Sequence, residues 1–168
     1  QGLYVFYSDG QDFGTAQEWL PPTGQSTSFA LLGYSDFNGD GMLDLYEVFT
    51  PNKINIALNH QNSTHTWLNS SLLGDWTFQT RMIDINNDGL SDIVQDKGFP
   101  SINTTRVGYN TGDGATYTDL TTIISPISIA RPSGYFFDVN GDGLKDFLWR
   151  EDAGVYVSLN QGNSFSSP

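Results

Sequence analysis

Short stretches in which apolar and polar residues alternate recur along the whole chain and predict β-strands. Four of them run into a polar turn that is followed by an aromatic residue, at 3–10 with Phe13, 54–60 with Trp67, 107–112 with Tyr117 and 155–162 with Phe165. No stretch keeps a 3.6-residue apolar period over three helical turns, so we expect little helix. The β-branched and aromatic residues, with frequent Gly, Asn and Pro between them, favour an all-β fold.

These hairpin-like elements repeat at a nearly constant spacing. Tyr7, Leu58, Tyr109 and Leu159 occupy the same place in the four copies, at steps of 51, 51 and 50 residues. A period near 50 residues is typical of solenoids, propellers and other repeat arrays. We therefore expect residues 1–168 to form a single repeat array, with approximate units at 1–51, 52–104 and 105–152 and a partial unit at 153–168.

A nine-residue acidic motif also occurs three times, at 36–44, 84–92 and 138–146, and each copy fits D-x-N-x-D-G-x-x-D. A short strand is predicted to enter each motif and another to leave it. Together with the hairpins, this gives four strands in about 50 residues, which is the size of one propeller blade. The expected architecture is a tandem array of four-stranded blades of β-propeller type, with three full repeats plus a partial fourth.

The acidic motif has oxygen-bearing side chains at its positions 1, 3, 5 and 9. A hard cation such as Ca²⁺ takes about six to eight oxygen ligands from carboxylates, amides, backbone carbonyls and water. Glycine at position 6 permits the positive φ that a tightly curled loop needs. The apolar residue at position 7 can then contribute its backbone carbonyl. Three such loops predict calcium as the cofactor, with three ions bound.

Other interpretations of the motif are open. Asp, Asn and Gly are frequent in plain turns, but this explains neither the shared aspartate at position 9 nor the crowding of three carboxylates. EF-hands and dockerins start with a similar acidic pattern, yet an EF-hand needs flanking helices and a glutamate at position 12. That position holds Glu47 in the first loop but Gln95 and Trp149 in the others. Magnesium fits less well, because it favours a small octahedral site that keeps several waters.

Composition narrows the classes of partner. The chain has 19 acidic and 7 basic residues, for a formal net charge of −12, and no basic stripe that could neutralise phosphates, so nucleic acid is not an expected partner. It has no cysteine and no apolar run long enough for membrane insertion. Calcium loops of this kind suit extracellular calcium, so we expect a secreted or cell-surface protein. Sequons begin at Asn62, Asn69 and Asn103.

The acidic motif between short strands, followed by V-Y-V-x-x-N-x-G-x-x-F at 155–165, resembles the FG-GAP/VCBS repeat over essentially the whole chain. That repeat builds calcium-loaded β-propellers in integrin α-subunit heads, in some fungal lectins, and in bacterial surface and toxin proteins, where the loops are usually structural. The resemblance implies that position 7 binds calcium through its backbone carbonyl. The implied ligands are Asp36, Asn38, Asp40, Met42 and Asp44; Asp84, Asn86, Asp88, Leu90 and Asp92; and Asp138, Asn140, Asp142, Leu144 and Asp146.

Few residues outside the loops suggest chemistry. His60 and His65 lie in a polar hairpin tip without a third metal ligand nearby in sequence, so we interpret them as solvated loop residues. No nucleophile elbow, phosphate loop or zinc-protease motif occurs, and we expect no enzymatic activity. Most aromatic residues are expected to fill the space between blades, but large aromatics can also stack on sugar rings or anchor a protein partner. Trp67 and Trp76, beside the most variable connector, are the predicted ligand-binding residues.

We therefore expect a non-catalytic, calcium-binding extracellular module that recognises carbohydrate in the clefts between repeats. The alternative is a protein-binding adhesion or scaffold module within a larger surface or toxin protein. An open array of this length leaves sheet edges exposed, which is an aggregation hazard. Either the chain is a fragment of a longer one, or copies form a homo-oligomer that completes a propeller ring, or the terminal segments cap the array. Self-association is slightly favoured.

Overall fold

The computed structural model describes residues 3–19, 31–50, 53–60, 64–71, 80–96, 104–114, 116–118, 121–124 and 134–168. All regular secondary structure in these residues is β-strand, which confirms the all-β prediction. Accordingly, the described part of the chain contains no helix that is long and apolar enough to cross a membrane.

The strands form four antiparallel sheets, in each of which neighbouring strands are consecutive in sequence. The first sheet contains β1 (Leu3–Val5) and β2 (Gln17–Trp19). The second contains β3 (Leu31–Ser35), β4 (Asp44–Thr50), β5 (Lys53–His60) and β6 (Thr64–Ser71). The third contains β7 (Thr80–Ile83), β8 (Asp92–Asp96), β9 (Thr104–Gly108) and β10 (Thr121–Ile124). The fourth contains β11 (Tyr135–Phe137), β12 (Asp146–Glu151) and β13 (Gly154–Ser158).

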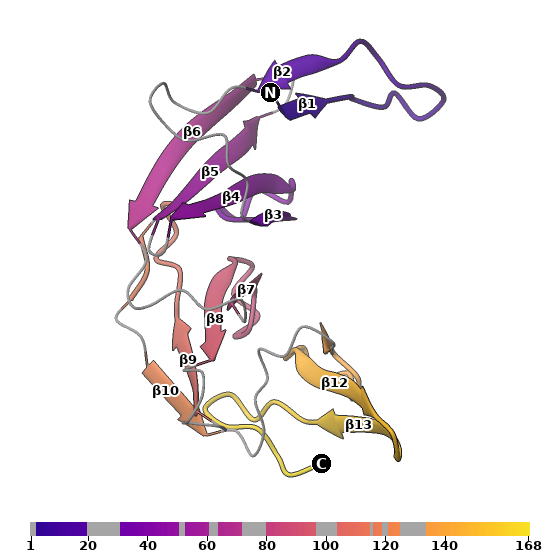
Figure 1. Ribbon diagram of the computed structural model, residues 1–168, viewed down its shortest axis with the longest axis vertical. Helices are drawn as coiled ribbons and strands as arrows, with labels where there is room; N and C mark the ends of the chain where they lie inside the picture. The colour runs from indigo at the N-terminus through magenta and orange to yellow at the C-terminus, as the bar shows by residue number, and fades with distance from the viewer. Residues whose placement is uncertain are drawn as a thin grey trace.

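The four sheets follow one another along an open arc (Figure 1). Strands β3 and β7 lie on its concave side and β6 and β10 on its convex side, as in blades arranged around an axis. The first sheet lies at one end of the arc and the fourth at the other. Only the second and third sheets have four described strands, so the predicted count of three full repeats is not confirmed.

Each acidic loop joins the first two strands of a sheet: 36–44 joins β3 to β4, 84–92 joins β7 to β8, and 138–146 joins β11 to β12. The repeated hairpin follows as the third strand of that sheet. The hairpin at the start of the chain has the same geometry as the later ones, because each contains a matching β-bridge. The bridges pair Ser8 with Phe13, Asn110 with Tyr117 and Asn160 with Phe165. Strands β1 and β2 therefore correspond to the third and fourth strands of a sheet.

The core lies between successive sheets rather than inside any one of them. Between the second and third sheets, Phe37, Ile54, Ile56, Leu58 and Ile93 form a buried cluster. Between the third and fourth sheets, the buried cluster is Ile85, Val94, Val107, Phe147, Trp149 and Phe165. Because side chains alternate between the two faces of a strand, each sheet presents one face to the preceding sheet and one to the next.

Candidate functional sites

Each acidic loop curls around the aspartate at its position 1, which accepts two or three backbone N–H groups from among positions 4, 5 and 6. In the first loop, the carboxylate of Asp36 accepts N–H groups from Gly39 at 2.7 Å and from Gly41 at 2.9 Å. Gly41 has a φ of 82°, and the position-6 glycines of the other loops are similar. The sequence prediction of a positive φ at position 6 is therefore confirmed. Comparable bonds to the position-1 carboxylate occur in the second and third loops.

Positions 3, 5 and 7 are linked by a short ladder of hydrogen bonds. The Asn38 amide donates to the Asp40 carboxylate at 3.0 Å, and the Asp40 N–H donates back to Asn38 Oδ1 at 3.2 Å. The Met42 N–H then donates to Asp40 Oδ1 at 2.9 Å. The same three bonds recur in both other loops. The three loops therefore share one conformation, as their common motif predicts.

The aspartate at position 9 has a different role, because it is fully buried in all three loops. In the first loop, Asp44 accepts the Phe37 N–H at 2.8 Å through one oxygen and the Asn59 N–H at 2.8 Å through the other. The equivalent pairs of bonds occur in the other loops. This carboxylate therefore ties its loop to the end of the third strand of the same sheet.

Burial and backbone N–H groups act on the loop carboxyls in opposite directions. Burial raises the pKa of Asp92 to about 6, although the N–H groups of Asn110 and Ile85 oppose the shift. Burial likewise raises the pKa of Asp44. At Asp138, which is less buried, the N–H of Gly143 is the main cause of a lowered pKa. At Asp44 and Asp92, the negative charge is therefore costly in the absence of a cation.

The acidic loops of adjacent sheets also contact one another. The side-chain amide of Asn110 donates to the Phe37 carbonyl at 2.8 Å and to the Ser91 carbonyl at 3.2 Å. The Ser91 N–H donates to the Asp36 carbonyl at 2.9 Å. Asn160 makes the equivalent bond from the fourth sheet to the Ile85 carbonyl, at 2.9 Å. The loops therefore form part of the contact between the second and third sheets and of that between the third and fourth.

The predicted ligands of each loop lie together in one tight turn, but their carboxylates face backbone N–H groups. In the described part of the chain, no three acidic or histidine side chains are grouped as ligands around one point. Sequence reasoning missed that position 4 also has a positive φ, at Gly39, Asn87 and Gly141. The signal was present, since all three copies carry Gly or Asn there. The role of the strand-end asparagines was missed as well, although they recur in the hairpin pattern.

A second candidate site lies between the first two sheets. Trp19 of β2 stacks on His65 of β6, with ring centroids 4.4 Å apart, and His65 meets Trp67 edge to face at 6.1 Å. Residues opposite each other in an antiparallel ladder share a face. The ladders pair Trp67 with Ala57, and Glu47 with Asn55, so these side chains lie on the face of the second sheet that receives Trp19.

Within the residues that the structure describes, this face contains buried polar atoms without hydrogen-bond partners. Glu47 is 1 % exposed and Asn55 is fully buried; burial raises the pKa of Glu47, and the neighbouring Asn55 amide opposes this only partly. Buried polar groups in proteins are nearly always paired, so these atoms call for a water molecule or another polar group within hydrogen-bond distance. Among the described residues, the atoms without a hydrogen bond of normal geometry are Tyr7 Oη, Trp19 Nε1, Glu47 Oε1, both amide atoms of Asn55, and Trp67 Nε1. Within this set, Tyr7 lies close enough to Trp19, and Glu47 to Asn55, for their polar groups to interact.

The corresponding positions in the other sheets are filled differently. In the third sheet, Arg106 donates to Gln95 at 3.4 Å. In the fourth, Trp149 stacks on Tyr156 with centroids 5.5 Å apart, and its indole N–H donates to Glu151 at 3.2 Å. Among the described residues, the contact between the first two sheets therefore combines a buried carboxyl at this position with indole groups that have no hydrogen-bond partner.

The remaining sequence candidates have mixed outcomes. Trp67 is partly buried rather than freely exposed, and Trp76 lies outside the described residues. His65 is not the solvated loop residue that we expected, because it is partly buried against Trp19, and burial lowers its pKa. His60 lies nearby, and its Nε2 is 2.9 Å from the Thr66 hydroxyl.

Comparisons with known proteins agree with this fold. Residues 36–94 match the family of FG-GAP-like repeats. A lectin from Agrocybe aegerita, described as specifically recognising non-reducing terminal N-acetylglucosamine, is similar in structure with a TM-score of 0.70 and 21% sequence identity. The similarity covers 99% of this chain and 46% of the lectin chain. No curated protein matched the chain by sequence.

A second similar structure is the Tc holotoxin pore of Photorhabdus luminescens, with a TM-score of 0.56 and 22% identity, covering 81% of this chain and 6% of that one. At these identities the likeness concerns the fold. This chain thus spans less than half the length of either protein. The resemblance inferred from the acidic motif is confirmed: the chain carries an FG-GAP-like repeat at 36–94, in an all-β fold similar to those of the lectin and the toxin.

Proposed function

We propose that the chain is a non-catalytic, calcium-stabilised module of β-propeller type that acts outside the cell and recognises carbohydrate. The donor set of the loops supports calcium, since each loop offers three carboxylates, an amide oxygen and a position-7 carbonyl. A carboxylate oxygen that accepts one N–H still has acceptor capacity for a cation. The ligands are those implied by the motif, from Asp36 to Asp44, Asp84 to Asp92 and Asp138 to Asp146.

Bound calcium would supply positive charge where each loop crowds three carboxylates into nine residues. The protein's own part is to hold the loop in the curled form, through the N–H groups that position the Asp36, Asp40 and Asp44 carboxylates in the first loop. We infer that the ions are structural, because the loops lie at the contacts between sheets.

The polar face between the first two sheets is the observation that supports carbohydrate binding. Sugars combine hydroxyl groups, which donate and accept hydrogen bonds, with C–H faces that pack on aromatic rings. Glu47 Oε1 is an acceptor, the indole N–H groups of Trp19 and Trp67 are donors, and the Asn55 amide is both. Their rings and unpaired polar atoms together match a neutral, hydroxyl-rich ligand better than a charged one. The lectin similarity makes terminal N-acetylglucosamine the first sugar to test.

A glycan array that includes glycans with terminal N-acetylglucosamine, probed in calcium and in chelator, tests the proposal. We expect binding to a defined terminal sugar in calcium and its loss in chelator. Binding would then be measured by calorimetry for Glu47→Gln and Trp67→Phe. Glu47→Gln keeps the shape of the side chain and exchanges an acceptor oxygen for an amide donor, whereas Trp67→Phe keeps an aromatic ring and removes the indole N–H. In each variant we expect sugar affinity to fall about tenfold.

Trp149→Phe is the matched control, because Trp149 lies between the third and fourth sheets and its indole N–H already has a partner. Sugar affinity should be unchanged in this variant. A blank array from folded, calcium-loaded protein would contradict carbohydrate recognition. It would favour the protein-binding scaffold, to which the toxin similarity points.

A further inference from the structure

The large hydrophobic side chains that are exposed in the described residues all lie on two surfaces at opposite ends of the arc. We call one of them the first end surface; it lies on the outward faces of the first sheet and of the concave part of the second. We call the other the last end surface; it lies on the outward face of the fourth sheet. The first comprises Tyr4, Phe6, Phe13, Tyr34 and Leu43. The last comprises Tyr135, Phe137, Val139 and Val155.

The residues of the first end surface have buried or packed equivalents inside the arc. Phe13 is 74% exposed, whereas Phe165, at the same place in the fourth sheet, is only 4% exposed. Phe165 belongs to the buried cluster between the third and fourth sheets. Tyr34 is 69% exposed, whereas Met82, two residues before the next acidic loop as Tyr34 is before the first, packs against the second sheet. The first end surface is therefore of the kind that contacts a preceding sheet.

The last end surface shows the complementary pattern. Val139, at position 2 of the third acidic loop, is 48% exposed, whereas Phe37 and Ile85 at the same position are 0% and 5% exposed beneath the next sheet. Val155 is 68% exposed, whereas Ile54 at the same place in β5 is fully buried. The last end surface is therefore of the kind that contacts a following sheet.

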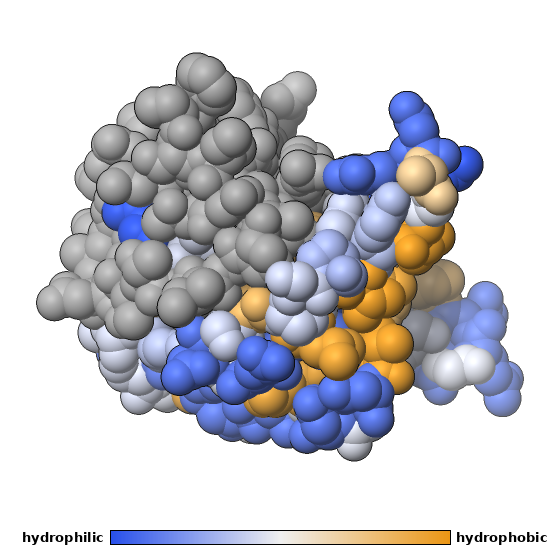
Figure 2. Space-filling model, turned by 90° about the horizontal axis from the view of Figure 1, so that it is seen from below, coloured by the Kyte–Doolittle hydropathy of each residue, from blue (hydrophilic) through white to orange (hydrophobic). Residues whose placement is uncertain are grey.

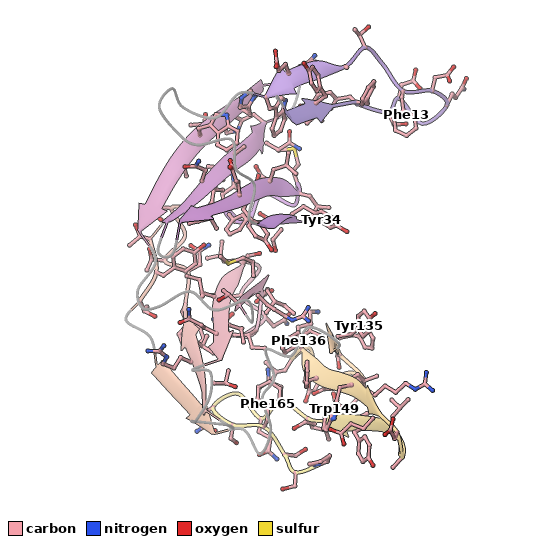
Figure 3. All side chains as sticks on the ribbon, viewed as in Figure 1. Phe13, Tyr34, Tyr135, Phe136, Trp149 and Phe165 are labelled. Atoms are coloured by element: carbon pink, nitrogen blue, oxygen red, sulfur yellow. The ribbon has the colours of Figure 1, made fainter. Side chains whose placement is uncertain are left out.

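The figures agree with this assignment. Figure 3 shows Tyr34 and Tyr135 pointing into the open space on the concave side, and Phe13 far out on the first hairpin. Figure 2 shows hydrophobic surface gathered over the end of the molecule where the fourth sheet lies, with hydrophilic atoms beside it. Large apolar side chains that are exposed together on one surface often mark an interaction site.

We propose that the last end surface of one chain packs against the first end surface of a second copy of this chain, head to tail. Each of the two hydrophobic clusters inside the arc joins a face that contacts a following sheet to a face that contacts a preceding sheet, and the two end surfaces supply one face of each kind. The contact is heterologous, because neither surface is of the kind that packs against itself. This inference is independent of the proposed calcium and sugar binding.

Sedimentation velocity of the chain over a wide concentration range, in calcium, tests the proposal. We expect wild type to associate with rising concentration. Phe13→Asp and Val155→Asp should each shift the protein to monomer, because each places a charge in one of the two surfaces. Both side chains are exposed, so the fold should tolerate the changes, and circular dichroism and thermal melts check this. Asn163→Asp, which adds the same charge in an exposed turn, should associate like wild type.

Mixing the two variants distinguishes the proposed geometry from other kinds of association. Phe13→Asp keeps an intact last end surface and Val155→Asp keeps an intact first end surface. An equimolar mixture should therefore form one heterodimer, although each variant alone is monomeric. The proposal is overturned if wild type stays monomeric at all concentrations, if Val155→Asp alone still associates, or if the mixture stays monomeric.

Discussion

The buried aspartate at position 9 both holds its loop in place and carries a charge that burial disfavours. At Asp92, one carboxylate oxygen accepts the Ile85 N–H inside the loop and the other accepts the Asn110 N–H from the end of β9. The side chain is fully buried, so its charge is costly unless a cation is close. Position 9 is therefore where the needs of the fold and of the proposed calcium ion meet in one side chain.

The raised pKa of Asp92 predicts a pH dependence of stability in the metal-free protein. The folded-state pKa is about 6 and the ordinary value is 3.8, so folding favours the protonated form. The resulting stabilisation is full below about pH 4 and is lost as pH rises through about 6. The free energy of unfolding, measured by denaturant titration across this range, should therefore fall with pH. The slope should be smaller in Asp92→Asn; parallel curves for the two proteins would contradict this account.

Asn110 should contribute more to stability than its counterpart Asn59. The buried Asn110 amide donates two hydrogen bonds, to the Phe37 and Ser91 carbonyls, and so bridges two sheets. The Asn59 amide donates to the Leu43 carbonyl at 3.3 Å, within one sheet. Asn110→Ala should cost about 1–3 kcal/mol, because it leaves a buried carbonyl unpaired. Asn59→Ala should cost less, and equal losses in chemical denaturation would show that the bridging bond adds no stability.

At the scale of the element, the acidic loop depends on backbone conformations that few residues adopt. Gly41 has a φ of 82°, and a methyl group built on it would meet no atom within 4 Å. Gly41→Ala should therefore destabilise the protein through its backbone alone, by about 1–2 kcal/mol. Gly41→Asn should cost less, because asparagine tolerates this region better. Denaturant unfolding of the two variants measures the difference, and a costlier Asn variant would refute the explanation.

The loops and the strands around them are predictable from sequence because their causes are local. The alternation of residues 54–58 predicts a strand, and the motif from Asp36 to Asp44 fixes its own turn through bonds between near neighbours. The pairing of Glu47 with Asn55 depends instead on the register between β4 and β5. The stacking of Trp19 on His65 depends on how two sheets meet. Neither leaves a periodic signal, so His65 was misassigned to a solvated loop.

At the scale of the whole molecule, the chain is held together by contacts between sheets as well as within them. The spacing of Tyr7, Leu58, Tyr109 and Leu159 predicted the repeat, but not how the strands divide among sheets. The division places each acidic loop ahead of the hairpin that follows it, and leaves the first hairpin as a two-stranded sheet. That grouping is a long-range property, since it depends on which strands pair and not on the local pattern. The predicted division into units therefore stays a prediction.

Titration of calcium into metal-free protein by calorimetry, with thermal melts of the same samples, tests the central claim most directly. We expect three ions per chain and a higher melting temperature in calcium than in chelator, because a ligand that binds only the folded state stabilises it. Asp40→Ala, Asp88→Ala and Asp142→Ala should each bind one ion fewer. Identical melting curves in calcium and in chelator, with no ions bound, would contradict the account.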